Sequence, residues 1–495
     1  MRVSPTLCAA HGFSLKMAML LFALLLALGG QAQPDGRLDA TFNPGTGFDG
    51  IEGPSVYSIA LQPDGKVLVA GFFERFNGVN RKSIARLNAN GSLDASFNPG
   101  SGIGGGFGGS GLCVLVLPSG KILVGGNFSA YNGQTQGNIA RINPDGSLDG
   151  TFNTGSGFNS FVFSIAMQPD GKLLVGGDFT SFNGVSCNRI ARLNADGTLD
   201  ASFQPGNGAD GYVYCITPQA DGNIWIGGWF NNVGGRARKG IALLNANGTL
   251  NTSFNPGSGV GGIIKSISLL PGGNLVIGGY FNSYNGTLVA SMAKIGQRGG
   301  LDRAFTQGRG FWGPPQAEAS TITPLGDGRL LITGSFYYYD NDPRKGIIRL
   351  NANGTIDPTF NPGDGMSAGG QFDPVVRSHA IQPDGKILVA GKFTTFGGVS
   401  RNGIARLSGT PVLAKSELPT TATIWPNPAT HSVRIECAGP IRQARLVNLA
   451  GQEVIHLLAG TQNLAMDVTS LPRGLYIVEL QTAQGQWQRQ RLIVE

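Results

Sequence analysis

Short apolar runs separated by polar turns recur along most of the chain. Within residues 56–97 the runs VYSIAL, KVLVAGFF, SIARL and LDASF are each 5 to 8 residues long, which suits strands and is too short for helices. The turns between them, QPDGK, FNG and NANG, place Asn or Asp before Gly, where a tight hairpin needs a positive φ. The pattern predicts four antiparallel strands in this unit.

The same unit then repeats. Its LDxxF motif recurs at intervals of 55, 55, 51, 51, 51 and 55 residues, and four strands in about 50 residues are typical of one β-propeller blade. The chain begins with an LDxxF segment that no blade precedes, and the last unit ends near Ser408 without one. The sequence therefore predicts an all-β fold, a seven-bladed β-propeller over residues 33–409 that is closed by its N-terminal strand. The motifs begin at Leu38, Leu93, Leu148, Leu199, Leu250, Leu301 and Ile356.

The repeated segments QPDGK, GGxF, IARLN and LDxxFNPG extend from Leu38 to about Ser408. Together they resemble the delta-60 repeat family, a bacterial β-propeller repeat to which no general biochemical function is assigned. The resemblance implies the propeller fold, and it implies neither a ligand nor a cofactor.

Residues 1–32 have the form of an export signal. Arg2 and Lys16 flank the apolar run 17–28, and small residues lead to an expected cleavage site at Ala32. An apolar run of 12 residues is too short to span a bilayer, so we expect no retained transmembrane segment. Removing the signal lowers Lys plus Arg from 37 to 35 against 30 Asp plus Glu, a net charge of +5 with no basic run. We therefore expect no nucleic-acid partner.

The repeat stops after Gly409, and the chain changes character. Residues 410–422 read as a linker, and residues 423–495 contain short alternating strands that predict a small β-sandwich. The ordered set of PNP, NLAGQ, GLYIV and a terminal strand resembles the C-terminal sorting domain, type A, of the type IX (Por) secretion system. The resemblance implies the type IX machinery as a partner, and a protein released or held at the surface of a Gram-negative cell. Its motif residues are Pro426, Asn427, Pro428, Gly451, Gly474 and Tyr476.

All variation in repeat length falls in one connection. From Lys66 to the next LDxxF the spacing is 27 residues in six units, whereas the following connection varies from 24 to 30. We expect this connection on the same face as the loop between the second and third strands, and we look for function there. The unit around residues 309–342 carries aromatic side chains beside charged groups, which suits sugar rings and their hydroxyls. The candidate ligand-binding residues are Arg309, Phe311, Trp312, Tyr337, Tyr338 and Asp342.

A purely structural reading of this loop is open as well. Tyr339 falls on the register of Phe76 and Phe182, which predicts packing, and Asp340-Asn341 takes the place of the usual Asn-Gly turn. The loop can therefore be a longer piece of local packing without any ligand.

Catalytic and metal chemistry find little support. The turns at Asn143 and Asn194 resemble calcium loops but lack the acidic ligand at the twelfth position, so we expect hairpin turns and no metal or cofactor. His379 is the single His of the repeat region, and we expect it to lie on an inner strand with its hydrogen bonds satisfied.

We expect no catalytic residues. Paired loop acids leave a polysaccharide-degrading enzyme as the alternative. The acids considered are Asp49, Glu52, Asp364 and Asp373.

The leading hypothesis is therefore an exported, non-catalytic propeller whose loops bind a glycan or a surface macromolecule. A purely structural component of the cell surface is the third possibility.

Overall fold

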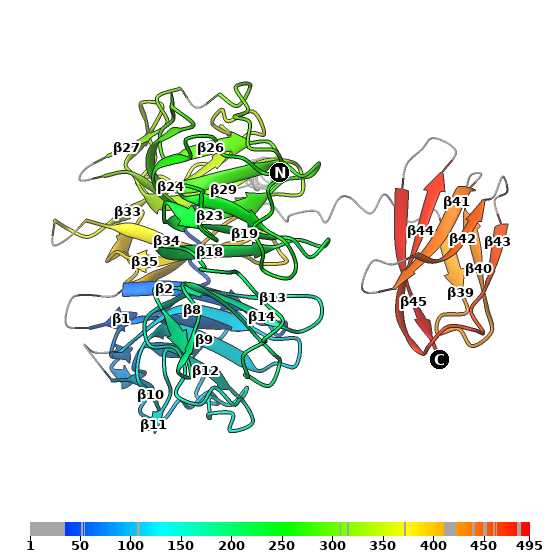
Figure 1. Cartoon of the computed structure of the whole chain (residues 1–495), viewed down its shortest axis with the longest axis horizontal. Coiled ribbons are helices and arrows are strands. Elements are labelled where there is room, and N and C mark those ends of the chain that lie inside the picture. The colour runs from blue at the N-terminus through cyan, green and yellow to red at the C-terminus, as the bar shows by residue number, and fades with distance from the viewer. Residues whose placement is uncertain are drawn as a thin grey trace, which may run out of the picture. The chain divides into compact units, whose positions relative to one another are not determined.

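The computed structural model describes residues 35–50, 53, 55–105, 109–306, 308–313, 316–370, 373–409, 422–437, 441–448, 453–458, 461, 463–482 and 487–495. The predicted signal with Ala32, most of the linker, Glu52 and Gly451 lie outside these ranges. The chain divides into two compact units, residues 1–411 and 412–495, each of which is described by itself (Figure 1).

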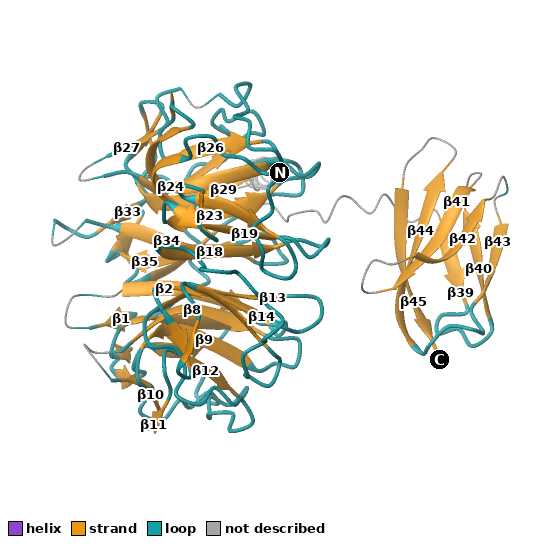
Figure 2. Ribbon diagram, viewed as in Figure 1, coloured by secondary structure: helices purple, strands orange, loops and turns teal. Residues whose placement is uncertain are grey.

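The described part of the chain consists of strands and loops (Figure 2). It contains no helix long and apolar enough to cross a membrane. In the first unit the described residues form seven antiparallel sheets with a first, a middle and a third strand. The first strands are β2 (Ser55–Leu61), β8 (Ser110–Val116), β13 (Val162–Met167), β18 (Tyr212–Pro218), β23 (Val260–Leu269), β28 (Glu318–Pro324) and β34 (Val375–Ile381). The middle strands are β3 (Val67–Phe72), β9 (Ile122–Asn127), β14 (Leu173–Gly177), β19 (Ile224–Trp229), β24 (Leu275–Tyr284), β29 (Leu330–Ser335) and β35 (Ile387–Lys392). The third strands are β6 (Ile84–Leu87), β12 (Ile139–Ile142), β17 (Ile190–Leu193), β22 (Ile241–Leu244), β26 (Met292–Ile295), β32 (Ile347–Leu350) and β38 (Ile404–Leu407).

The predicted fourth strand is not formed as a strand. In the first sheet the LDxxF segment makes one isolated bridge, Leu87 with Leu93, and then turns. The Asp94 carboxylate causes the turn, because its Oδ1 accepts both the N–H (3.0 Å) and the hydroxyl (2.7 Å) of Ser96. Hydrogen bonds from the backbone and side chain of Ser96 to Asp94 therefore form here in place of the backbone hydrogen bonds of a fourth strand.

A second set of small sheets gathers on one side of the unit. In each repeat the loop between the middle and third strands contains a two-residue hairpin, and in several repeats the incoming connection pairs with it. The labels β1, β27 and β33 lie along this side (Figure 1). The prediction that the connection and this loop share one face is therefore confirmed. The strands are β1 (Phe48–Asp49), β4 (Arg75–Phe76), β5 (Val79–Asn80), β7 (Ile103–Gly104), β10 (Ala130–Tyr131), β11 (Gln134–Thr135), β15 (Ser181–Phe182), β16 (Val185–Ser186), β20 (Asn232–Val233), β21 (Arg236–Ala237), β25 (Thr287–Leu288), β27 (Phe311–Trp312), β30 (Tyr338–Tyr339), β31 (Asp342–Pro343), β33 (Met366–Ser367), β36 (Thr395–Phe396) and β37 (Val399–Ser400).

Successive sheets are joined by hydrophobic clusters and by hydrogen bonds between first strands. A buried cluster lies between each sheet and the next, and the cluster that contains Val56 also contains Leu388 and Ile404 from the last sheet. The Ser58 hydroxyl accepts the N–H of Val114 from the second sheet at 3.2 Å. The hydroxyl of Ser378, in the last sheet, likewise accepts the N–H of Ile59 in the first, at 3.3 Å.

Two of these junctions use thiols in place of hydroxyls. Cys113 and Cys215 pair with Gly125 and Gly227 in the register that Ser58 has with Ala70. Burial raises the pKa of both thiols to about 12, so they stay protonated and pack as small apolar groups.

The N-terminal segment completes the contacts of the last sheet. Leu38 forms an antiparallel bridge with Leu407, and the N–H of Asp39 donates to the carbonyl of Arg406 at 2.8 Å. The Asp39 carboxylate lies 2.9 Å from Nε of Arg406 and 3.2 Å from Nζ of Lys386. The N-terminal LDxxF segment thus takes the place that the equivalent segment of the same repeat has in other sheets.

The recurring aspartate clamp consists of the LDxxF aspartate, an Arg from the third strand and a Lys or Arg at the start of the middle strand. In the first sheet the Asp94 carboxylate lies 2.7 Å from Nε of Arg86 and 3.0 Å from Nζ of Lys66. Nη1 of Arg86 donates to the carbonyl of Pro144 in the next repeat, at 2.5 Å, and its guanidinium covers the Phe97 ring. Burial opposes ionisation, but hydrogen bonds from Ser96, Lys66 and Arg86 hold the pKa of Asp94 well below its usual range. The Asp94 carboxylate therefore has a structural role.

The second unit contains two antiparallel sheets around one core. Buried side chains from both sheets, among them Val433, Met466 and Val478, form a single cluster. Asn427 accepts the N–H of Ile493 at 2.9 Å, and the Tyr476 hydroxyl donates to the carbonyl of Pro472 at 2.8 Å. The PNP segment is therefore fixed to the final strand. Gly474 opens β44 and pairs with Val494, while the Trp425–Pro426 and Asn427–Pro428 peptide bonds are cis. The strands are β39 (Ala422–Trp425), β40 (Ser432–Cys437), β41 (Ile441–Asn448), β42 (Glu453–Leu458), β43 (Asn463–Asp467), β44 (Gly474–Thr482) and β45 (Trp487–Val494).

Replacing Asp39 with Asn tests the N-terminal contact with the last sheet. Burial opposes the charge of Asp39, but hydrogen bonds from Thr41 and Lys386 and the charge of Arg406 lower its pKa to about 2. An unfolded Asp titrates near pH ~3.9, so this carboxylate stabilises the fold above about pH 4, and the contribution is lost as the pH falls towards 2. Asp39→Asn leaves Arg406 without its partner and is expected to lower the free energy of unfolding at pH 7 by about 2–3 kcal/mol in urea titrations.

Asp384→Asn is the matched control. Asp384 lies 3.6 Å from the same Lys386, but its side chain is 54% exposed. Losing this exposed ion pair with Lys386 is expected to change the free energy of unfolding by less than about 0.5 kcal/mol. Equal effects of the two variants would contradict a structural role for the N-terminal aspartate.

Candidate functional site

A groove opens between the fifth and sixth sheets, beside the small sheet of β27. Its volume is about 470 Å³. Tyr280 and Leu288 of the fifth sheet line it together with Arg309 and Trp312 from the connection that enters the sixth. The structure therefore brings three of the predicted residues, Arg309, Phe311 and Trp312, to one groove. It adds two apolar side chains from another repeat that the sequence had not linked to them.

The Trp312 indole is the most distinctive group in this groove. It is 43% exposed, and its ring stacks on Tyr338 with centroids 4.0 Å apart and planes at 11°. The pairing of Trp312 with Tyr338 in the ladder of β27 and β30 fixes this stack. One face of the indole is thus covered by Tyr338, and the ring is held in one orientation while it stays open to solvent.

Phe311 belongs to the core below the groove. It is 3% exposed, and its ring packs against Phe336 and Tyr339 with centroids 4.5 Å and 4.8 Å apart. Phe311 also borders the groove, but most of its ring packs into the core, because successive residues of a strand point to opposite sides. Tyr339 is also buried and donates its hydroxyl to Gly354, which confirms the packing role predicted for it.

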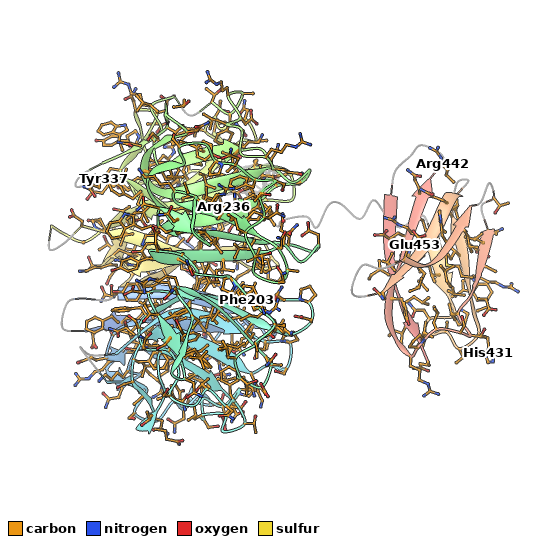
Figure 3. The ribbon with its side chains drawn as sticks, in the orientation of Figure 1. Phe203, Arg236, Tyr337, His431, Arg442 and Glu453 are labelled. Carbon is orange, nitrogen blue, oxygen red and sulfur yellow. The ribbon has the colours of Figure 1, made fainter. Side chains whose placement is uncertain are left out.

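The other predicted residues lie in different surroundings. Tyr337 lines a second hollow of about 460 Å³ with Lys345 and Asp373, on the side of the unit that carries β33 (Figure 3). Burial, and then the charge of Asp373, raise the pKa of the Tyr337 hydroxyl. The Asp342 carboxylate is engaged by Arg344, with Oδ1 2.7 Å from Nη1. The six predicted residues therefore do not all line the same hollow.

Asp340 has a structural role in the same loop. With Asn341 it forms the hairpin turn, at φ angles of 47° and 68°. Its Oδ1 accepts the N–H of Arg309 at 3.0 Å, as Asn77 accepts the N–H of Gly47 in the first repeat. The turn residue thus ties the incoming connection, and with it the groove wall, to the hairpin.

His379 is buried, and both nitrogens of its ring have a hydrogen-bond partner. The His379 imidazole lies between two hydroxyls, with Nδ1 2.8 Å from Oγ1 of Thr333 and Nε2 2.8 Å from Oγ1 of Thr323. Burial lowers its pKa to about 4, so the ring is neutral at pH 7, and the prediction of a satisfied inner-strand residue is confirmed. Within the described residues no group of three or more His, Cys, Asp or Glu side chains is placed to hold a metal ion.

One set of residues was missed by the sequence analysis. In each repeat the third residue of the run that starts at Ser55 lies in a β-bulge, and its type changes from repeat to repeat while its neighbours change little. That variation within a regular frame was the signal that could have drawn attention to Tyr57, Tyr214, Lys265 and Arg377.

Family profiles match both units of the chain. The profile described as a domain of unknown function (DUF5122) beta-propeller matches residues 62–97, 117–152, 168–203, 219–254, 325–360 and 382–409. A two component regulator propeller profile matches residues 207–230, and the secretion system C-terminal sorting domain matches residues 423–495. The chain carries DUF5122 β-propeller repeats and a type IX sorting domain. The sorting domain directs export through type IX secretion to the cell surface or the extracellular space.

Solved structures give distant likenesses to this chain. PorZ of Porphyromonas gingivalis, a surface component of the type IX secretion system, is 13% identical over 90% of this chain and 60% of its own, with a TM-score of 0.45. The chain thus spans about 60% of the length of PorZ. Virginiamycin B lyase of Staphylococcus aureus is 16% identical over 73% of this chain and 97% of its own, with a TM-score of 0.44. No curated protein matches the chain. None of these likenesses is close enough to bear on its function.

Variants of Asp340 test whether that residue holds the incoming connection against the hairpin. Asp340→Ala removes the acceptor for the Arg309 N–H and places Ala at a positive φ, so it is expected to cost about 1–3 kcal/mol of unfolding free energy. Asp340→Asn is expected to stay within about 0.5 kcal/mol of wild type, because Asn occupies this turn position in the first repeat. Thermal unfolding of the two variants gives the comparison. A stable Asp340→Ala protein would contradict the structural role.

Proposed function

We propose that the exported DUF5122 protein is a closed, seven-bladed propeller that binds carbohydrate in the groove between its fifth and sixth blades. Three observations support the ring. The described repeats contain seven sheets, a hydrophobic cluster lies between each and the next, and the last sheet contacts both the first sheet and the N-terminal segment. The domain division follows: propeller at residues 33–409, linker at 410–422 and sorting domain at 423–495.

The observation that carries the binding function is the exposed Trp312 ring, fixed by its stack on Tyr338 at 4.0 Å. A flat aromatic surface that is already ordered binds the apolar face of a sugar ring at little cost in side-chain entropy. Tyr280, which is 38% exposed, supplies a second aromatic ring in the same groove. Arg309 and Asn282 add hydrogen-bonding groups for hydroxyls.

The propeller is proposed to act without catalysis. Asp342 is neutralised by Arg344, and Asp373 lies in the second hollow beside Lys345. Asp49 and Asp364 are not among the described residues that line either hollow. These placements favour recognition over glycoside cleavage, which requires two acids flanking one bond. The secretion machinery is the partner of the sorting domain, and the glycan is the partner of the propeller.

Binding of the mature chain, residues 33–495, to a glycan array tests the groove. Trp312→Ala and Tyr280→Ala are each expected to weaken binding to the recognised glycan by at least about 10-fold, since each removes an aromatic contact worth about 1.4 kcal/mol. Tyr338→Ala is expected to weaken it less, because it frees the indole without deleting it.

Trp425→Ala is the matched control, because this indole is 46% exposed and belongs to the sorting domain. It is expected to bind as wild type does. Thermal unfolding shows that each variant is folded. If the array shows no glycan whose binding depends on both Trp312 and Tyr280, the groove does not bind carbohydrate.

A further inference from the structure

The first strands of all seven described sheets carry a β-bulge at the same place. In the first sheet Val56 pairs with Gly71 and Ser58 pairs with Ala70, so Tyr57 between them has no partner in the ladder. A bulge redirects the side chain of the extra residue and is common beside functional sites. The bulged residues are Tyr57, Leu112, Phe163, Tyr214, Lys265, Ser320 and Arg377.

The Gly-x-Phe motif of each repeat makes room for the bulge. A Cβ on Gly71 would collide with the carbonyl of Ser55, and one on Gly391 would collide with the carbonyl of Val375. The same collision recurs at the corresponding glycine of every described sheet. The repeat therefore fixes the bulge by its backbone and leaves the bulged side chain free to vary.

The bulged residues contact one another across neighbouring sheets and remain open to solvent. The Arg377 guanidinium lies 4.9 Å from the ring centroid of Tyr57, and Nζ of Lys265 lies 3.5 Å from that of Tyr214. The Tyr214 ring in turn lies 4.8 Å from that of Phe163. All seven bulged residues are half-buried, whereas the residue before each is buried. They thus line a surface that solvent reaches, next to the closed packing between sheets.

The two cations of this set are held by aromatic rings. Within the described part of the chain, Lys265 and Arg377 form no ion pair with a carboxylate, and Nε of Arg377 is buried without a hydrogen-bond partner. Among the described residues Nε of five other arginines is in the same state, so the ring contacts of the two cations are their distinguishing feature. Burial lowers the pKa of Lys265, the charge of Glu318 opposes that effect, and the charge of Arg377 adds to it. Lys265 and Arg377 lie in the bulges of β23 and β34, the two first strands that contact β28, so an anion beside β28 would interact with both charges.

Glu318 supplies the opposite kind of group. Its Oε1 accepts the hydroxyl of Ser320 at 2.7 Å, and it lies at the start of the strand between those of Lys265 and Arg377. Two positive charges and one negative charge leave this surface with a net charge of +1, so an anion is favoured while an acceptor for hydroxyl groups is retained.

We propose that the bulged residues form a binding site for a sugar that carries a carboxylate, such as a hexuronic acid. Arg377 and Lys265 bind the carboxylate, for which the guanidinium offers a planar pair of donors. The rings of Tyr57 and Tyr214 contact the apolar face of the sugar. The Glu318 carboxylate accepts a hydrogen bond from a hydroxyl group of the sugar. The site shares no residue with the groove beside Trp312, so each proposal can fail while the other holds.

Calorimetric titration of the mature chain with D-galacturonate tests the site. The probe is expected to bind, and Lys265→Met and Arg377→Met are each expected to weaken binding by at least about 10-fold, the effect of losing one charge-assisted contact. Lys265→Arg is expected to stay within about 3-fold of wild type, because it keeps the charge. Lys82→Met is the matched control, a half-buried lysine outside the bulges that is expected to bind as wild type does.

Two further probes separate the parts of the ligand. Galactose has the ring without the carboxylate, and acetate has the carboxylate without the ring; both are expected to bind at least about 10-fold more weakly than galacturonate. Thermal unfolding of each variant shows whether it is folded. Absence of galacturonate binding, or equal binding by wild type and folded Lys265→Met and Arg377→Met, would overturn the proposal. Equal binding of galactose would overturn the role of the cations, and equal binding of acetate would overturn the role of the aromatic rings.

Discussion

The aspartate clamp is the interaction on which the rest of the propeller unit depends. A single carboxylate, such as Asp94, turns the chain after the third strand, binds two cations and positions an Arg whose other nitrogen reaches the next repeat. It therefore replaces the missing fourth strand and links neighbouring sheets with the same few atoms. The carboxylate is almost fully buried, so the network holds only while every member has its partner.

The fourth sheet shows how the clamp can be exchanged for packing. Leu243 and Asn251 stand where most other repeats have the Arg and the Asp, whereas the fifth repeat has Lys294 paired with Asp302, and Trp225 is buried beside Leu243. The Trp225 ring meets Phe254 edge-on with centroids 4.6 Å apart, in place of the cation that covers the equivalent Phe in other repeats. A buried ion pair and a well-packed apolar group of similar volume are often equivalent in stability, which explains why one repeat can differ without changing the fold.

Because the clamp and the clusters between sheets fix the frame, two sets of positions are free to vary. The connection and hairpin on one face can differ in length and composition, and this freedom produces the groove beside Trp312. The bulged residues of the first strands can differ in type, since the backbone around them is fixed by the facing glycine. Binding surfaces built in this way combine a rigid support with variable side chains.

The sequence alone determined the repeat, the turns, the sorting domain and the all-β fold, because these depend on local patterns that recur at fixed spacing. It also singled out Trp312 and Arg309, since a departure from a repeat is visible in the sequence. The tertiary structure decided which residues face one another. Tyr280 lines the same groove as Trp312 although it belongs to a different repeat, and Phe311 is buried in the core. Arg377 contacts the Tyr57 ring although more than 300 residues separate the two in the sequence. The fourth strand was lost for the same reason, because a buried carboxylate and its partners from other strands outweigh the strand propensity of five residues.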